Sequence, residues 1–405
     1  MQQKNIFHPD NPSEKESILI AGAQIASAAG ILTANVSGEV KSMGDAFANE
    51  ISHRIITDFE KSEALYRGGK TDEKDLMAHV STFAYIGGNI YVTYYANATT
   101  NAEDPRFQVA RLVYCPEKDP DSKTYLDIQS VGDNCCGNSV EMVYDTILIP
   151  KDEDTLFLLW AAKVNGNYYR LYRTYQPSSG ALSEVGVNRF QAGDIVNDFS
   201  TTGIKSALAE NKIGVKKMYS DIGIMQKVTL HQENGETYYY TGAYSGDFNC
   251  IIKSRDLITW EYVSQPAFAN MSKWENAVYV FQDQCYYFVR QQDEEKYGFL
   301  TRYDLRTGKW AEPVLIEDCQ SRSDFIVYHN ELYLFHAPID RQHIGIVKID
   351  TNDIAKSKAV LQADMRGSCF YPFIQYCSDG ELGMSYTADR KHIRLARFTL
   401  SKYLL

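Results

Sequence analysis

The chain has 405 residues, a net charge of −11 at neutral pH and an aromatic content of 13%, with 29 tyrosines. A chain of this length could hold two or three average domains, although large all-β assemblies often run as one unit. The negative charge argues against a nucleic-acid partner, because phosphates attract basic surfaces. The abundance of tyrosine favours half-buried sheet surfaces and sugar-binding walls.

The N-terminal region shows no pattern of a membrane or signal segment. Residues 17–36 are mildly apolar, but Gln24, Ser27 and Asn35 interrupt them and acidic residues precede them. This stretch is too polar for a transmembrane helix and lacks the basic start of a signal peptide. We therefore expect no membrane span, and either an intracellular protein or one from which a signal has been removed.

Helical spacing marks the next segment. Within residues 42–65, apolar side chains recur every three or four positions with charges between them, and Gly68 and Gly69 follow. Such spacing is typical of an amphipathic helix, and glycine ends helices. The sequence thus predicts an N-terminal helix over residues 42–65. Its apolar positions are Phe47, Ile51, Ile55, Ile56 and Phe59.

A strand pattern begins at residue 77. Residues 77–96 read as two strands rich in β-branched and aromatic residues, separated by a tight turn at Gly87-Gly88-Asn89. His79 lies at the start of the first strand, where a propeller would aim it towards its central axis. This hairpin is the unit that the rest of the chain repeats.

An aromatic-rich strand of about six residues recurs after a turn residue along the chain. The last four instances begin at residues 237, 284, 331 and 381, a spacing near 47. A period of this length with four short strands per unit is the mark of a β-propeller blade. The six instances are residues 89–95, 155–160, 237–242, 284–290, 331–336 and 381–386.

The predicted fold is all-β, a single β-propeller over residues 1–405. Residues 1–70 would supply strands and the helix, and residues 71–405 the blades. Six blades are visible as repeats, and we favour a seventh that the N-terminal strands close together with residues 391–400, because closure buries the edges of an open ring. Before residue 237, an insertion contains a further predicted helix at residues 202–211.

Candidate site residues follow from propeller geometry, because the inner strands of successive blades converge around the axis. Any one of these residues could instead tie blades together structurally. No histidine pair has the spacing of metal ligands, so we expect no metal and no cofactor. The early inner-strand residues are His79, Glu141, Asp221, Glu275, Asp324 and Tyr371, with Gln226, Lys227, Arg290, Arg322 and Arg366 nearby.

Two further patterns concern structure. Residues 254–260 match the Ser-x-Asp-Leu-x-x-Trp turn that is common in sugar-acting propellers and is structural. The eight cysteines are dispersed, apart from the adjacent pair Cys135-Cys136, and show no zinc spacing. We expect buried free thiols and no disulfide, with this pair as the one candidate exception.

Residues from about 72 to 397 resemble the propeller enzymes of glycoside hydrolase family 145. The resemblance begins with Ala78-His79-Val80-Ser81 and includes the block Lys273-Trp274-Glu275-Asn276. The blocks are long and span nearly every blade. They are residues 78–81, 91–97, 102–105, 143–148, 219–226, 234–238, 273–276, 318–325 and 335–341.

The resemblance implies a seven-bladed enzyme that removes L-rhamnose α-1,4-linked to D-glucuronate at the ends of arabinogalactan chains. It implies His79 as the catalytic residue and a periplasmic or secreted location. Arg322 and Arg366 are our candidates for holding the uronate carboxylate. Tyr371 and Gln226 are candidates for sugar contacts.

A single histidine suits this substrate. The glucuronate C5 proton is acidic, and a neutral imidazole could abstract it if a cation neutralises the carboxylate, so that rhamnose leaves by β-elimination. Hydrolysis assisted by the substrate's own carboxylate is a second route, and the sequence does not separate the two.

Two other functions fit the sequence. One is a propeller glycosidase with two carboxylates, and the other is a non-catalytic propeller that binds glycans or proteins. The partner we expect is an oligosaccharide or polysaccharide of plant type, with no nucleic acid and no membrane, bound by a monomer.

Overall fold

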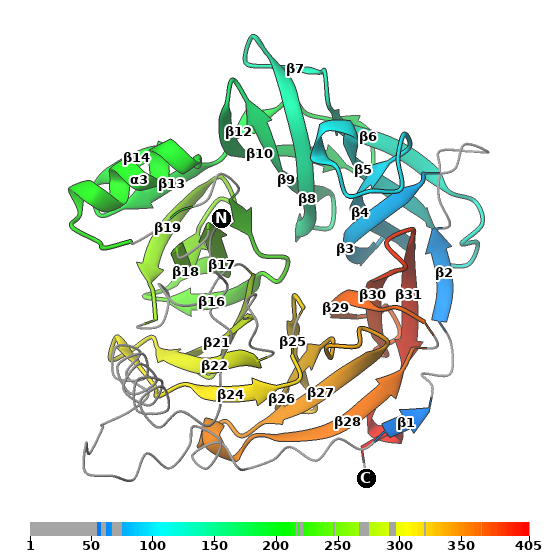
Figure 1. Cartoon of the computed structure of the whole chain (residues 1–405), viewed down its shortest axis with the longest axis vertical. Helices are drawn as coiled ribbons and strands as arrows, with labels where there is room; N and C mark the ends of the chain where they lie inside the picture. The colour runs from blue at the N-terminus through cyan, green and yellow to red at the C-terminus, as the bar shows by residue number, and fades with distance from the viewer. Residues whose placement is uncertain are drawn as a thin grey trace, which may run out of the picture.

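The computed structural model describes residues 55–57, 62–66, 75–215, 218, 222–245, 248–266, 275–290, 297–319, 321–365 and 367–404. Of residues 55–57 and 62–66, only the backbone pairing is described. These parts of the chain form six β-sheets arranged in a ring, which Figure 1 shows along the shortest dimension of the molecule. All-β architecture and the propeller arrangement are thus as the sequence predicts.

The first sheet begins with the predicted hairpin, and the second sheet comes next along the chain. The first contains β3 (Met77–Ile86), β4 (Asn89–Asn97), β5 (Gln108–Pro116) and β6 (Thr124–Ser130), with the short helix η1 (Pro105–Phe107) before β5. The second contains β7 (Asn134–Cys135), β8 (Asn138–Asp152), β9 (Thr155–Val164), β10 (Asn167–Gln176), β11 (Ala181–Leu182) and β12 (Gly186–Val187).

The insertion that precedes residue 237 contributes to the third sheet. The third contains β13 (Arg189–Ala192), β14 (Ile195–Asp198), β15 (Gly223–Ile224), β16 (Thr229–Glu233), β17 (Glu236–Ser245), β18 (Phe248–Ser254) and β19 (Thr259–Ser264). The fourth contains β20 (Asn276–Phe281), β21 (Gln284–Arg290), β22 (Tyr297–Asp304), β23 (Lys309–Trp310) and β24 (Val314–Glu317).

The last two sheets each receive a strand from the N-terminal region. The fifth contains β25 (Asp324–Tyr328), β26 (Glu331–His336), β27 (His343–Ile349), β28 (Lys358–Asp364) and β1 (Ile55–Thr57), with η2 (Ile354–Lys356). The sixth contains β29 (Phe370–Tyr376), β30 (Leu382–Ala388), β31 (His392–Phe398) and β2 (Ser62–Tyr66), and η3 (Leu400–Lys402) follows.

The six repeats predicted from the sequence correspond to the strand that pairs with the inner strand of each sheet. They fall on β4, β9, β17, β21, β26 and β30. These strands lie inside their sheets, and almost every side chain in them is buried. A strand buried on both faces needs a continuous apolar run rather than alternation. That requirement explains why this strand carried the clearest repeat signal.

The ring closes through contacts between the first and sixth sheets. The rings of Phe83 and Phe373 meet edge to face at 5.6 Å, and the Ser81 hydroxyl donates to that of Ser385 at 3.0 Å. Every other pair of consecutive sheets also shares a buried apolar cluster. A seventh blade is therefore not confirmed, and the segment 391–400 assigned to it contains β31, part of the sixth sheet.

The predicted N-terminal helix is wrong where the structure describes it. Residues 55–57 form β1, which pairs in parallel with β28, and residues 62–66 form β2, which pairs antiparallel with β31. Both β28 and β31 would otherwise expose an unpaired backbone edge. Pairing at these edges prevails over the helical spacing of the apolar side chains. Residues 42–54 and 58–61 of the predicted helix lie outside the described residues.

The second predicted helix is confirmed. It is α3 (Thr201–Glu210), one residue out of register with the prediction. The Ser200 side chain accepts a hydrogen bond from the Gly203 amide at 3.0 Å and caps the first turn. Ile204, Ala207 and Leu208 are buried against the third sheet. Among the described residues, no helix is long and apolar enough to cross a membrane.

The predicted turn at residues 254–260 is present and well bonded. Asp256 Oδ1 accepts hydrogen bonds from the amides of Ile258 and Thr259, both at 2.8 Å, and from the Ser254 hydroxyl at 3.0 Å. The turn places Trp260, which is fully buried, into the core between the second and third sheets.

We expect Asp256→Ala to lower the free energy of unfolding by about 1–2 kcal/mol, because two backbone amides lose their acceptor. Denaturant titration measures the change. Asp194→Ala, at an exposed turn of the same sheet, is the matched control and should stay within about 0.5 kcal/mol of the parent. Equal effects of the two variants would contradict this account of the turn.

Candidate functional site

The candidate site lies where the inner strands begin. β3, β8 and β29 each contain an irregularity in their pairing close to this end. At these irregularities Val80, Asp145 and Tyr371 have φ values of 53°, 53° and 55°. Left-handed backbone is costly for residues other than glycine, and bulges of this kind redirect side chains. Three strands thus turn their side chains at the same level of the ring.

Arg322 is the buried centre of the cluster. Its Nη2 lies 2.8 and 3.0 Å from the two carboxylate oxygens of Asp145 and 3.1 Å from Glu275 Oε1. Its Nη1 lies 3.5 Å from Gln226 Oε1. The guanidinium carbon lies 4.9 Å from the centre of the Tyr371 ring. One side chain therefore connects residues of four sheets or their leading segments.

Glu275 and Tyr371 form the second part of the cluster. Arg290 Nη1 donates to Glu275 Oε2 at 2.5 Å and to the Tyr371 hydroxyl at 3.3 Å, so one guanidinium group joins the carboxylate and the phenol. Burial opposes ionisation of Glu275, but Arg290 and Arg322 outweigh it and lower its pKa to about 2. Burial and the nearby Glu275 charge raise the pKa of Tyr371. The resting state is thus a carboxylate beside a neutral phenol.

His79 lies directly beneath Tyr371. The two rings stack with centroids 4.5 Å apart, and His79 Nδ1 lies 2.9 Å from Thr387 Oγ1. The side chain has no solvent exposure, whereas Tyr371 is partly exposed. Burial, followed by the Arg390 and Arg322 charges, lowers the pKa of His79 well below its ordinary value. The imidazole is therefore neutral at physiological pH.

A partly exposed cationic rim surrounds Tyr371. The guanidinium carbons of Arg341 and Arg390 lie 5.0 and 5.5 Å from the centre of the Phe370 ring. Arg390 forms an ion pair with Glu103, and the Tyr95 hydroxyl donates to Glu103 Oε1 at 2.6 Å. Burial and the like charge of Arg290 lower the pKa of Arg341. This rim offers positive charge to an incoming anion.

The structure brings some of the predicted site residues together and places others elsewhere. His79, Arg322, Tyr371 and Glu275 meet in one cluster. Gln226 reaches it from the segment between β15 and β16, and its Nε2 donates to the Pro372 carbonyl at 2.9 Å. The predicted candidates were expected at the axis, but three lie apart from this cluster, and two more, Arg366 and Asp221, lie outside the described residues. The three that lie apart are Glu141, which pairs with Lys163, and Asp324 and Lys227, which pair with each other.

Sequence reasoning missed five members of the site: Asp145, Arg170, Glu103, Arg341 and Arg390. Three of them lie within blocks of the family resemblance, at residues 143–148, 102–105 and 335–341, so that signal could have found them. Arg390 follows β30 in a turn and carries no comparable signal. The described residues contain no group of three or more histidine, cysteine or acidic side chains that could hold a metal ion.

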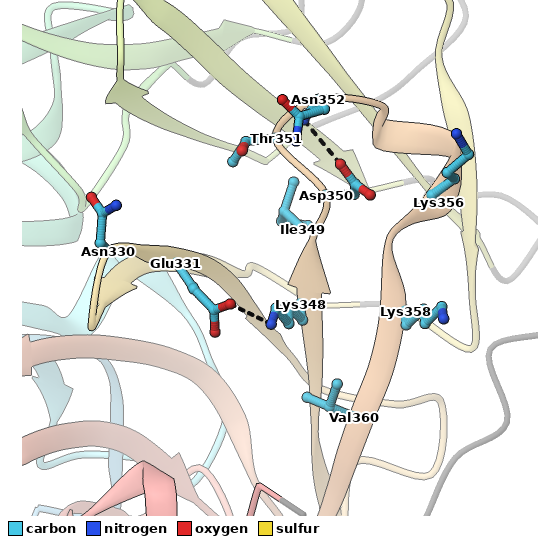
Figure 2. Close-up of a pocket in the computed structure, with 10 residues that line it drawn as sticks. All are labelled: Asn330, Glu331, Lys348, Ile349, Asp350, Thr351, Asn352, Lys356, Lys358 and Val360. Atoms are coloured by element: carbon cyan, nitrogen blue, oxygen red, sulfur yellow. Dashed lines mark hydrogen bonds and ion pairs between the residues drawn. The ribbon is translucent and has the colours of Figure 1, made fainter.

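The cavity in Figure 2 is separate from this site. It has a volume of about 430 Å³ and lies along β27 and β28 of the fifth sheet. Its charged lining consists of Glu331, Lys348, Asp350, Lys356 and Lys358. Glu331 and Lys348 already form an ion pair with each other. None of the cluster residues lines this cavity.

Glu275 predicts a dependence of stability on acid pH. Its pKa is about 2 in the folded protein and about 4.3 in an unfolded chain, so the stabilisation is complete above the unfolded value and is lost as pH falls towards 2. Between pH 5 and 3.5, we expect the free energy of unfolding of the parent to fall by about 1 kcal/mol more than that of Glu275→Gln. Urea titrations across this range measure both slopes, and identical slopes would contradict the prediction.

Comparison with known proteins places the fold but no family. No protein-family model matches the sequence, and no curated protein matches it. A solved structure of a Hadza microbial sialidase has a TM-score of 0.58 and 11% identity, covering 85% of this chain and 69% of that chain. The NanB sialidase from Streptococcus pneumoniae has a TM-score of 0.52 and 9% identity, covering 84% and 71%. At these identities the likeness concerns the propeller fold.

Proposed function

We propose that the protein is a carbohydrate-active enzyme that cleaves a glycosidic bond at a sugar carrying a carboxylate. The observation that carries the proposal is the partly exposed Tyr371, whose hydroxyl accepts a hydrogen bond from Arg290 where the inner strands converge. The same Arg290 nitrogen also donates to Glu275. Its backbone is strained at this point, with φ of 55°. Strain of this kind persists where the surrounding structure enforces it, often at functional sites.

The geometry suits tyrosine as a nucleophile. Glu275 stays ionised and can accept the phenol proton while the oxygen attacks the anomeric carbon, which matches the pairing of a nucleophile with an adjacent base. Sialidases are glycosidases that use a tyrosine in this way. Arg290 and Arg322 stabilise the charge that passes between the two oxygens.

The charge balance favours an acidic substrate. Among the described residues, five arginines face three carboxylates in and around the cluster. Arginine forks bind carboxylates in bidentate fashion, and Arg341 and Arg390 are the partly exposed ones beside Tyr371. The arginines are Arg170, Arg290, Arg322, Arg341 and Arg390, and the carboxylates are Glu103, Asp145 and Glu275.

The first substrate we propose is L-rhamnose-α-1,4-D-glucuronate, as the family resemblance implies, with a sialoside as the comparison that the sialidase-like fold suggests. In the histidine route, His79 acts as the base. Its neutral state supports that role, but contact with substrate requires Tyr371 to move aside, because the imidazole is fully buried. We therefore favour the tyrosine route, in which His79 supports the Tyr371 ring.

The two alternative functions fit less well. A glycosidase with two catalytic carboxylates needs an acid and a base that both reach substrate. Asp145 and Glu275 instead share the buried Arg322 and are themselves buried. A non-catalytic glycan-binding propeller would need the arginine rim but would not need the phenol held against a carboxylate.

The tyrosine route and the histidine route predict opposite effects of substituting Tyr371 and His79. We expect Tyr371→Phe to lower the rate of rhamnose or sialate release by about 10²–10⁴-fold, the usual contribution of a catalytic group, and His79→Gln to retain measurable activity. Hydrolysis should give free sugar and no unsaturated uronate. Ultraviolet absorbance detects the unsaturated uronate, which forms only by elimination. If His79→Gln is inactive, Tyr371→Phe is active and the unsaturated product forms, the histidine route replaces ours.

Arg341 should act on binding of the substrate carboxylate. We expect Arg341→Ala to raise KM for the acidic substrate by about tenfold, as for the loss of one charge-assisted hydrogen bond, while the methyl ester of the same substrate shows little change. Arg306→Ala serves as the control, because it removes the same charge from an exposed turn away from the cluster. Arg306 pairs there with Asp283. Equal KM changes for acid and ester would contradict carboxylate recognition.

A further inference from the structure

The turn between β7 and β8 has an unusual residue at a strained position. Cys135 pairs with Asn138, so Cys136 and Gly137 form a two-residue hairpin loop. Both have positive φ, 54° and 83°. Two-residue loops with positive φ at both positions are strongly biased to Asn-Gly or Gly-Gly. A cysteine at the first position costs of order 1 kcal/mol.

The neighbouring cysteine supplies a partner. Cys135 is 3% exposed and packs against Ile128 and Val140, whereas Cys136 is exposed, unlike the other seven cysteines, all of which are buried and free. The two cysteines are adjacent in sequence, so their Cα atoms are about 3.8 Å apart. The Cys136 thiol is thus open to oxidants in solvent, whereas the Cys135 thiol of the adjacent residue is buried.

We propose that Cys135 and Cys136 form a reversible vicinal disulfide, which makes the tip of this hairpin a redox-modification site. The inference does not depend on the proposed glycosidase activity. The oxidant we name is a small disulfide such as glutathione disulfide. Cys136 is the thiol that such a molecule can reach.

The exchange is balanced in two steps. The Cys136 thiolate attacks one sulfur of glutathione disulfide, a mixed disulfide forms and one glutathione thiolate leaves. The Cys135 sulfur then attacks the Cys136 sulfur and releases the second glutathione. Two protein thiols are oxidised to one disulfide, one glutathione disulfide is reduced to two glutathione molecules, and the two thiol protons end on these.

The resulting bond would be easily reduced. Adjacent Cα atoms are about 3.8 Å apart, closer than the roughly 4.4–6.8 Å of ordinary disulfides. Strained and exposed disulfides have more oxidising potentials and are the labile, regulatory ones. Its formation would reshape the turn that begins β8, the strand that carries Asp145 and contacts η1.

Intact-mass and peptide analysis test the proposal on the full chain. The protein is equilibrated with glutathione disulfide, quenched with acid and alkylated. The tryptic peptide of residues 124–151 contains these two cysteines and no others. We expect it to lose two hydrogen masses, to resist alkylation, and to recover both thiols in excess reduced glutathione.

Matched variants separate the two chemistries that Cys136 could undergo. Cys135→Ser should keep one glutathione on Cys136, because no second thiol can resolve the mixed disulfide, and Cys136→Ser should leave the peptide unmodified. In the parent protein, a stable glutathione adduct or an unmodified peptide at equilibrium would overturn the vicinal disulfide. These measurements read the covalent state and do not require the enzyme to be active.

Discussion

The ion pairs of Arg322 are the interaction on which the arrangement of the site depends. A buried guanidinium is costly to remove from water, and only well-placed carboxylates offset that cost. Asp145 comes from the second sheet and Glu275 from the start of the fourth, so both sheets must be correctly placed before Arg322 is satisfied. Removing one partner would leave an uncompensated charge in the centre of the ring. The same pairs fix the ring of Tyr371 above the guanidinium.

The site also illustrates how an acidic protein can present a basic surface. The chain carries a net charge of −11, yet five of its arginines gather in and around the cluster, where carboxylates from other sheets pair with Arg322 and Arg390. Low local polarity strengthens the field of such a cluster towards an anion. Because Arg170, Arg290 and Arg322 are buried, the attraction for substrate falls to the partly exposed rim, where Arg341 and Arg390 flank Phe370.

Irregular pairing in the inner strands is the structural basis of the cluster. A regular strand would alternate its side chains between the two faces of its sheet. The irregularities near Val80, Asp145 and Tyr371 interrupt that alternation at one level of the ring. They bring a histidine, a carboxylate and a phenol from three sheets close to one guanidinium. The proposed chemistry therefore rests on local departures from a regular fold, which the surrounding sheets compensate.

The sequence by itself determined the six repeats, the hairpin at residues 77–96, the helix α3 and the turn at Asp256, because strand periodicity, helix capping and turn chemistry act between near neighbours. It also placed His79, Tyr371, Arg322 and Gln226 at the converging ends of the inner strands. Only the tertiary structure decided that His79 is covered by Tyr371, that Arg341 and Arg390 form the rim, and that residues 55–57 and 62–66 pair as strands. Those outcomes depend on how the ring closes, which sets distances between residues hundreds of positions apart and leaves no local pattern.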